Sequence, residues 1–306
     1  MLSRIAESLY WIGRYVERAE DTSRLLDVHL SVLLDDPWAP EDVVCASLLS
    51  AMGHENVEVA RRNEVLEFLA WDRESTSSVV GALYAARENT RRSREVVSSE
   101  LWETINVTWH EATRPARQAS PHSFLAWIRE RTALINGTAD STLSRDEAWH
   151  FLVLGRSLER ADMTARLVAT RSIAGGPSWT HLMRSCGAYQ TFLRTYHGAG
   201  SEENAAEFLL LDRLFPRSVY AALVTAESAL QHLNPVQGRS GVSEEARRVI
   251  GRVAHGSGVP RRRRAARRPA GGDGADPTGL LGHERRSAAP LLPAEYGWCL
   301  GGGGCP

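Results

Sequence analysis

Apolar residues recur at helical spacing through the first part of the chain. The first run is Ile5, Leu9, Ile12, Val16 and Ala19, then Leu26, Leu30 and Leu33, with Ser23 as the one gap. Alternating steps of three and four keep these side chains on one face of an α-helix. The pattern predicts a helix of about 30 residues that ends before Pro37.

Start and stop signals predict further helices. Ser120-Pro121 supplies an N-cap and a first-turn proline. Ser144 and Glu147 form a capping box, which predicts a helix to about Ser172 before Gly175-Gly176-Pro177. Other helices are expected at residues 75–100, 178–196, 202–214 and 216–233, and one beginning at Asn56 or Asn63. Since no Asn-Gly or Asp-Gly turn has flanking strand alternation, we predict an all-α, antiparallel multi-helix bundle.

Composition divides the chain near Gly251. Residues 1–250 hold 27 arginines against 33 acidic residues, whereas residues 251–306 hold 9 arginines, 4 acidic residues, 13 glycines and 6 prolines. We expect a helical domain over 1–250 and a disordered or irregular tail over 251–306. The tail's origin stays open between a basic arm and the product of a shifted reading frame in GC-rich DNA. Nucleic-acid binding is not expected, because the body is acidic.

Several kinds of chemistry are excluded or disfavoured. The sequence contains no lysine, which excludes a lysine Schiff base and a P-loop. The four cysteines form no CxxC pair, and no apolar run is long enough to span a membrane, so we expect a cytoplasmic protein. Glu147-x-x-His150 has the spacing of a di-iron motif, but no second Glu-x-x-His occurs. We expect no metal and no cofactor.

One segment occurs twice. Residues 11–26 (WIGRYVERAEDTSRLL) and 153–168 (VLGRSLERADMTARLV) share eight of sixteen residues at an offset of 142. Within each copy, an arginine, a glutamate and a second arginine stand at i, i+3 and i+4 and therefore share one helical face. These candidate site residues are Arg14, Glu17, Arg18, Arg156, Glu159 and Arg160. The repeat predicts two related helices in the bundle.

The role of these two charged faces stays open among three interpretations. They are solvated surface ion pairs, a buried structural network, or a site that reacts or binds a ligand. Apolar residues flank the charges, which favours burial of the faces. Two loops supply candidate supporting residues for an anion-binding pocket, namely Asp140, Asp212, Arg213 and Arg217.

Four segments carry a resemblance to a known family. They are LSRIAESLYWIGRYVERAEDTSRLLDV, SSVVGALYAARENTRRSREVVSSELWETIN, GTADSTLSRDEAWHFLVLGRSLERADMTARL and FLLLDRLFPRSV. Together they resemble the alpha-E family of bacterial helical proteins, named for an ER motif, over about residues 1–250. Similar proteins continue through further helices that this sequence lacks, which favours a shifted frame in the tail.

The resemblance implies a role beside other proteins. Members of the family accompany, or are fused to, circularly permuted ATP-grasp ligase-like proteins and transglutaminase-like proteins. It therefore implies an uncharacterised accessory or scaffold protein of a peptide-ligase or peptide-modification system, with those partners. The alternative is an enzyme, or a protein that binds an anionic ligand, through the Glu/Arg cluster.

Overall fold

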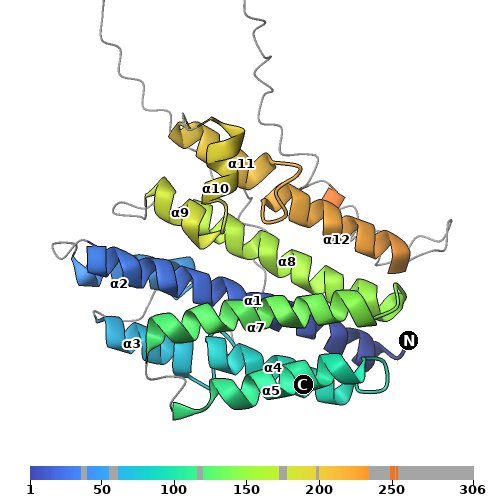
Figure 1. Ribbon diagram of the computed structural model, residues 1–306. Helices are drawn as coiled ribbons and strands as arrows, with labels where there is room; N and C mark the ends of the chain where they lie inside the picture. The colour runs from blue at the N-terminus through green and yellow to red at the C-terminus, as the bar shows by residue number, and fades with distance from the viewer. Residues whose placement is uncertain are drawn as a thin grey trace, which may run out of the picture. The chain divides into compact units, whose positions relative to one another are not determined.

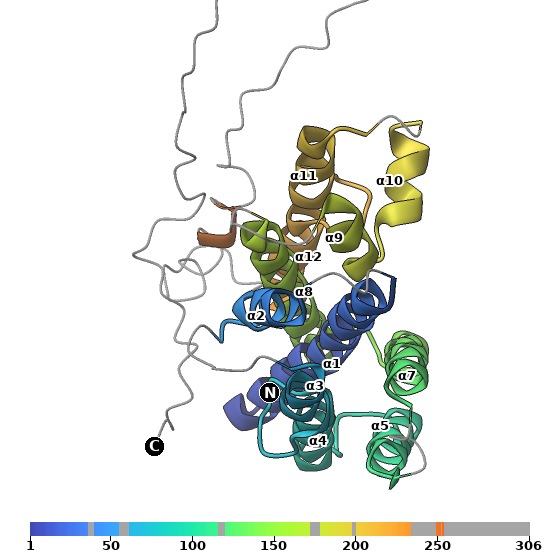
Figure 2. The ribbon, with the colours of Figure 1, turned by 90° about the vertical axis from the view of Figure 1, so that its left-hand side faces the viewer.

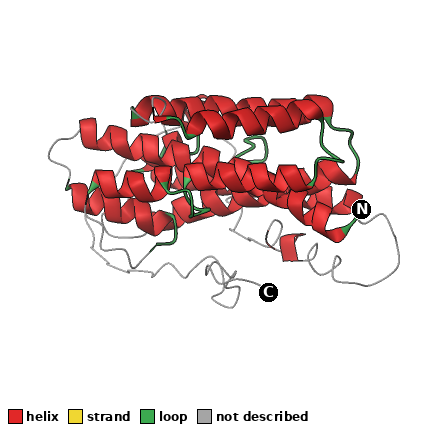
Figure 3. Cartoon of the chain, turned by 90° about the horizontal axis from the view of Figure 1, so that it is seen from below, coloured by secondary structure: helices red, strands yellow, loops and turns green. Residues whose placement is uncertain are grey.

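The computed structural model describes residues 1–35, 40–54, 61–115, 120–171, 178–197, 200–233, 249–251 and 253. Within these residues every regular element is a helix and no strand occurs, as predicted (Figure 3). Apart from Gly251 and Val253, the expected irregular tail over 251–306 lies outside the described residues. The stop at Gly175-Gly176-Pro177 lies outside them as well.

The first half of the chain forms α1 (Ser3–Asp35), α2 (Glu41–Ala51), α3 (Arg62–Leu66), the π-helical turn η1 (Glu67–Trp71), α4 (Val79–Arg92), α5 (Ser99–Ala112) and α7 (Pro121–Thr142). The second half forms α8 (Glu147–Thr170), α9 (Trp179–Ser185), α10 (Tyr189–Thr195), α11 (Glu202–Leu211) and α12 (Val219–Leu233).

Helices α1 and α8 lie at the centre, and their contact is the most extensive between any two elements (Figures 1 and 2). Helix α4 packs on α1, and α12 packs on α8. Helix α7 adds a further layer on α1, and α5 packs between α4 and α7. The charged faces predicted from the repeat therefore belong to the two helices at the centre of the fold.

Two glycines set the close approach of α1 and α8. A Cβ on Gly13 would overlap the carbonyl oxygen of Leu152, and a Cβ on Gly155 would overlap that of Tyr10. Gly13 matches Gly155 in the sequence repeat, and Tyr10 stands at the position that matches Leu152. The crossing is therefore reciprocal, and each glycine admits the backbone of the other helix.

The sequence contains a second pair of matching segments, one after each of the two central helices. Residues 67–86 and 207–226 share ten of twenty residues at an offset of 140, a similarity that we did not recognise from the sequence. In each copy a serine caps the following helix and its hydroxyl donates to the aspartate carbonyl six residues before. These bonds join Ser78 to Asp72 and Ser218 to Asp212. The pairs α1–α4 and α8–α12 are therefore built from matching residues.

The helix boundaries agree with the sequence in some places. Helix α1 spans the predicted stretch, and Ser120 caps α7 by accepting from the Ser123 amide. Helix α8 begins where expected, but its cap is Asp146, which accepts from the Ala148 and Trp149 amides, and not Ser144. The capping-box prediction was therefore wrong in its residue, because an aspartate next to the first turn also reaches these amides.

Other boundaries were wrong. Residues 75–100 form the end of a loop and parts of two helices rather than one, because α4 ends at Arg92 and Ser98 caps α5. Residues 178–196 are divided near Gly187, which has φ of 63°. The expected helices at 202–214 and 216–233 are shortened, since residues 212–218 form a loop. Helix α2 was not predicted at all.

Candidate functional site

The two copies of the ER motif bind each other. Arg18 of α1 donates from Nε and Nη2 to the two carboxylate oxygens of Glu159, at 2.6 and 3.0 Å. Arg160 of α8 donates in the same way to Glu17, at 2.6 and 2.8 Å. Each pair is bidentate, the strongest and most directional form of a guanidinium–carboxylate contact. The motif therefore joins α1 to α8 by two equivalent ion pairs.

Both carboxylates are buried. Glu17 is 0% exposed and Glu159 is 1% exposed, while the side chains of Arg18 and Arg160 are 15% and 19% exposed. The interpretation as solvated surface pairs is therefore wrong for these residues. A carboxylate at such a depth stays charged only when cations surround it.

Each glutamate also pairs with a second arginine. Arg14 pairs with Glu159 from one turn before Arg18 on α1. Arg217, in the loop before α12, lies 3.0 Å from Glu17, and it also pairs with Glu20, at 2.5 Å, and with Asp21. We call Arg14, Glu17, Arg18, Glu159, Arg160 and Arg217 the ER network. Every carboxylate oxygen in it accepts from at least one arginine.

The loop before α12 holds Arg217 in place. The Asp212 carboxylate accepts from the Leu214 and Phe215 amides, at 2.9 and 2.7 Å. The Thr164 hydroxyl of α8 donates to the Arg217 carbonyl, at 2.9 Å. In the matching loop of the first half, Arg18 reaches the Thr76 carbonyl at 3.5 Å. The loop before α4 and the matching loop before α12 thus each contact the charged residues of the ER network.

Charge and burial compete within the network. Burial by itself favours the neutral form of Glu17, but Arg217 and Arg160 outweigh it and lower the pKa of that carboxyl. Burial likewise disfavours the charged form of Arg217, and Asp21 and Glu17 outweigh it, so its pKa is raised. Burial dominates at Asp21 and raises its pKa to about 7.

Four of the candidate residues lie at the edge of the network or outside it. Arg156 lies 3.3 Å from the Asn136 side chain and 3.6 Å from Asp140, which is half exposed. Burial and the nearby Arg160 lower the pKa of Arg156. Asp212 serves as the loop cap described above. Arg213 stacks over the Tyr220 ring, with its Cζ 5.3 Å from the ring centroid.

Sequence reasoning missed Glu20, Asp21 and Arg24. Glu20 and Asp21 follow Glu17 at i+3 and i+4, so the same helical face carries all three carboxylates. Arg24 binds Glu20 at 2.8 Å, and its repeat counterpart Arg166 binds Asp162 at 3.0 Å. The spacing was visible in the sequence and would have extended the candidate cluster by one turn.

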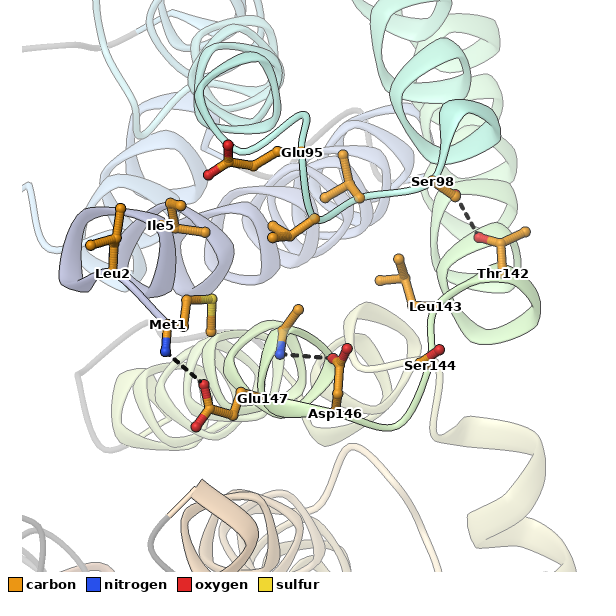
Figure 4. Close-up of a pocket in the computed structure, with 13 residues that line it drawn as sticks. Met1, Leu2, Ile5, Glu95, Ser98, Thr142, Leu143, Ser144, Asp146 and Glu147 are labelled. Atoms are coloured by element: carbon orange, nitrogen blue, oxygen red, sulfur yellow. Dashed lines mark hydrogen bonds and ion pairs between the residues drawn. The ribbon is translucent and has the colours of Figure 1, made fainter.

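A cavity in the described structure lies away from the ER network. It has a volume of about 730 Å³ and opens between the start of α1, the α4–α5 connection and the α7–α8 connection (Figure 4). Its lining includes Met1, Leu143 and Glu147, and the Met1 amine binds Glu147 at 3.0 Å. No residue of the ER network lines it.

The Glu147-x-x-His150 motif shows no metal-ligand geometry. His150 stacks on His232, with ring centroids 4.3 Å apart. Among the described residues, no three histidines, cysteines or acidic residues are arranged to hold a metal ion. Nor is any helix in those residues both long and apolar enough to cross a membrane.

Comparison with known proteins gives a family match. The model of the Alpha-E family, described as "a predicted alpha-helical domain with a conserved ER motif", matches residues 1–260. Uncharacterized proteins Mb2597 of Mycobacterium bovis and Rv2567 of Mycobacterium tuberculosis are each 25% identical over 278 residues. The match covers 80% of this chain and 31% of each relative, so the chain spans about a third of their length. No solved structure matches.

Proposed function

From the premise that this chain belongs to the Alpha-E family, we propose that it is a cytoplasmic helical scaffold of a peptide-ligase or peptide-modification system. Its partners are an ATP-grasp-like ligase, a transglutaminase-like protein, or both. In this proposal the ER motif is structural, and the chain supplies surfaces rather than catalytic groups.

The reciprocal pairing of the two ER motifs carries the proposal. A general base or nucleophile needs a group that is free to meet a substrate. The oxygens of Glu17 and Glu159 instead accept hydrogen bonds from Arg160 and Arg18. They also form ion pairs with Arg217 and Arg14. The ER network pairs its own charges and is buried where α1 crosses α8 at the two glycines. It therefore holds the pairs α1–α4 and α8–α12 in one arrangement. Such rigidity suits a protein that presents a surface to others.

The length of the relatives agrees with this role. This chain matches less than a third of Mb2597 and Rv2567, so the same helical segment occurs there within a longer polypeptide. A segment used in this way works beside additional protein, which is what a scaffold requires.

Co-expression tests the scaffold role. The full chain is produced with the ATP-grasp-like and transglutaminase-like proteins of the same genome, and the mixture is separated by size exclusion with light scattering. We expect a stoichiometric complex with one of them. Separate elution of all three proteins, each shown to be folded by circular dichroism, would overturn the proposal.

One observation favours a second candidate, binding of a small anionic ligand. The Arg156 guanidinium is mostly buried, yet its nearest carboxylate, Asp140, is 3.6 Å away and half exposed. An anion beside Arg156 would supply the close partner that its counterpart Arg14 has in Glu159. Inorganic phosphate at millimolar concentration is then expected to raise the melting temperature, and Arg156→Gln to abolish that rise.

A further inference from the structure

Arginines and tryptophans alternate where α4 packs on α5 (Figure 2). The guanidinium of Arg73, in the loop before α4, lies over the Trp109 ring of α5, with its Cζ 5.0 Å from the ring centroid. Arg87 of α4 lies 4.9 Å from the same ring and 5.7 Å from the ring of Trp102. Arg94, which follows α4, lies 4.9 Å from the Trp102 ring. These contacts are cation–π interactions, and we call the five residues the Arg–Trp row.

The matching helix of the second half is built without such arginines. In α12, Glu227 and Gln231 stand at the positions that match Arg87 and Arg91. Helix α12 nevertheless begins at the equivalent cap, Ser218, and packs on α8 as α4 packs on α1. The packing of α4 on α1 therefore does not require arginines at these positions, and the row needs another explanation.

The row offers positive charge and hydrogen-bond donors. Arg73 and Arg94, at its two ends, are exposed, and neither forms an ion pair with a carboxylate of the described residues. The indole N–H of Trp109 is buried and likewise has no acceptor in the described part of the chain. A carboxylate that reaches the row would therefore meet donors that lack an acceptor.

The chain's own carboxylates leave the ends of the row open. Glu88 of α4 is already shared between Arg87 and Arg91, at 2.5 and 3.0 Å. Exposed carboxylates that directly follow row residues in the sequence pair with none of the row arginines, namely Glu74, Glu95 and Glu103. They add negative charge at the edge of the row, so removal of one of them should strengthen the binding of an anion.

The stacking decides which kind of anion the row can bind. A guanidinium that lies over a ring keeps its N–H edge free for a bidentate contact with a carboxylate. Single-stranded nucleic acid instead needs open aromatic faces on which bases stack, and in the row guanidiniums already occupy the rings of Trp102 and Trp109. With steps of about 5 Å between its members, the row is at most about 20 Å long, the reach of about six extended residues.

We propose that the Arg–Trp row binds an acidic peptide segment of a partner protein, with aspartate or glutamate carboxylates of the segment at Arg73 and Arg94. Charge complementarity selects this occupant, because the ends of the row are cations without a carboxylate. The proposal does not depend on the scaffold role, since it names the chemistry of the segment and not the protein that carries it.

A short acidic peptide tests the row. Labelled hexaglutamate, whose extended length matches that of the row, is titrated into the full chain and followed by fluorescence anisotropy. We expect saturable binding that weakens as salt is added, and no binding of hexaglutamine. Arg73→Gln combined with Arg94→Gln should weaken the binding of hexaglutamate by about tenfold or more, because both charge-assisted contacts are lost.

The second half supplies a matched control. Arg213 is an exposed arginine in the loop that matches the loop of Arg73, and its Cζ lies 5.3 Å from the centroid of the Tyr220 ring. Arg213→Gln should leave the affinity unchanged, whereas Glu103→Gln should raise it by about twofold. Each variant should melt within error of wild type, because the substituted side chains are exposed.

Four results would overturn the proposal. They are the absence of saturable binding, an equal loss of affinity in Arg213→Gln, an affinity that the double variant leaves unchanged, and tighter binding of a thymidine oligonucleotide that displaces the peptide. The third result would assign the binding to another basic stretch, such as the arginine-rich residues 261–268. The fourth would make the row a nucleic-acid surface. A failed co-expression test leaves these readings unaffected, because the titration involves only this chain and the peptide.

Discussion

Arg18 and Glu159 are joined by two hydrogen bonds across the crossing of α1 and α8, and their counterparts Arg160 and Glu17 are joined in the same way. In this chain, the glutamate of each ER motif thus binds the arginine of the other motif. Side chains one residue apart on a helix do not face each other, so the glutamate and the arginine of one motif bind partners on the other helix.

Removing one charge of this pair should destabilise the fold. Glu159→Gln leaves Arg18 and Arg14 without their buried carboxylate, which costs about 3–5 kcal/mol of unfolding free energy. Urea denaturation followed by circular dichroism measures it. Glu147→Gln is the matched control, because its side chain is 57% exposed, and it should stay within about 0.5 kcal/mol of wild type. A loss at Glu159 no larger than at Glu147 would contradict a structural role.

Removing both partners should cost less than the two single losses together. Arg18→Met combined with Glu159→Met removes both charges of this pair, and only Arg14 then lacks its buried carboxylate, whereas Glu159→Met alone leaves both arginines without it. We expect a coupling free energy of at least about 1.5 kcal/mol in a double-mutant cycle measured with urea. Additive losses would mean that the bidentate contact contributes little in solution.

The glycine crossing makes a sharper prediction. Gly13→Ala places a methyl group against the Leu152 carbonyl, which belongs to backbone and cannot turn aside. We expect α1 and α8 to separate and the melting temperature to fall by more than about 10 °C. The control is Gly137→Ala in α7, where no atom lies within 4 Å of the added Cβ. This control should raise the free energy of unfolding by about 0.5–1 kcal/mol, because alanine is a better helix former than glycine.

Asp21 should make stability depend on pH. Its pKa is raised from 3.8 to about 7, so between these values the folded state holds a proton that the unfolded state has released. The contribution of Asp21 is therefore fully present below about pH 4 and is lost as pH rises toward 7. His29, whose pKa is lowered to about 4, acts in the opposite direction, and it is present in both proteins compared.

The measurement is a difference between two proteins. Unfolding free energies of wild type and Asp21→Asn are determined by urea denaturation from pH 4.5 to 8. Relative to the variant, wild type should lose stability as pH rises, and the loss should level off above about pH 7. A difference that is flat over this range, or that grows with pH, would mean that Asp21 is not held neutral in the fold.

Much of this architecture was predictable from local pattern. The three-and-four spacing from Ile5 to Leu33 is the spacing of α1, and Ser120-Pro121 begins α7 where expected. Predictions failed where the signal was a turn inside a helical run, as at Ser93–Ser98 and at Gly187. Both segments carry helix-compatible neighbours, and the tertiary contacts of short helices decide where such runs break.

The ER network, too, was predictable from the sequence only in part. The repeat shows that two related helices each carry an arginine, a glutamate and an arginine on one face, with a glycine directly before the first arginine. It does not show that the faces meet, that Glu17 binds Arg160 rather than Arg14, or that Arg217 joins from a loop; these follow from the fold. Helical periodicity depends on neighbours along the chain and is therefore visible in the sequence. Pairing depends on the crossing of α1 and α8, which long-range packing alone sets.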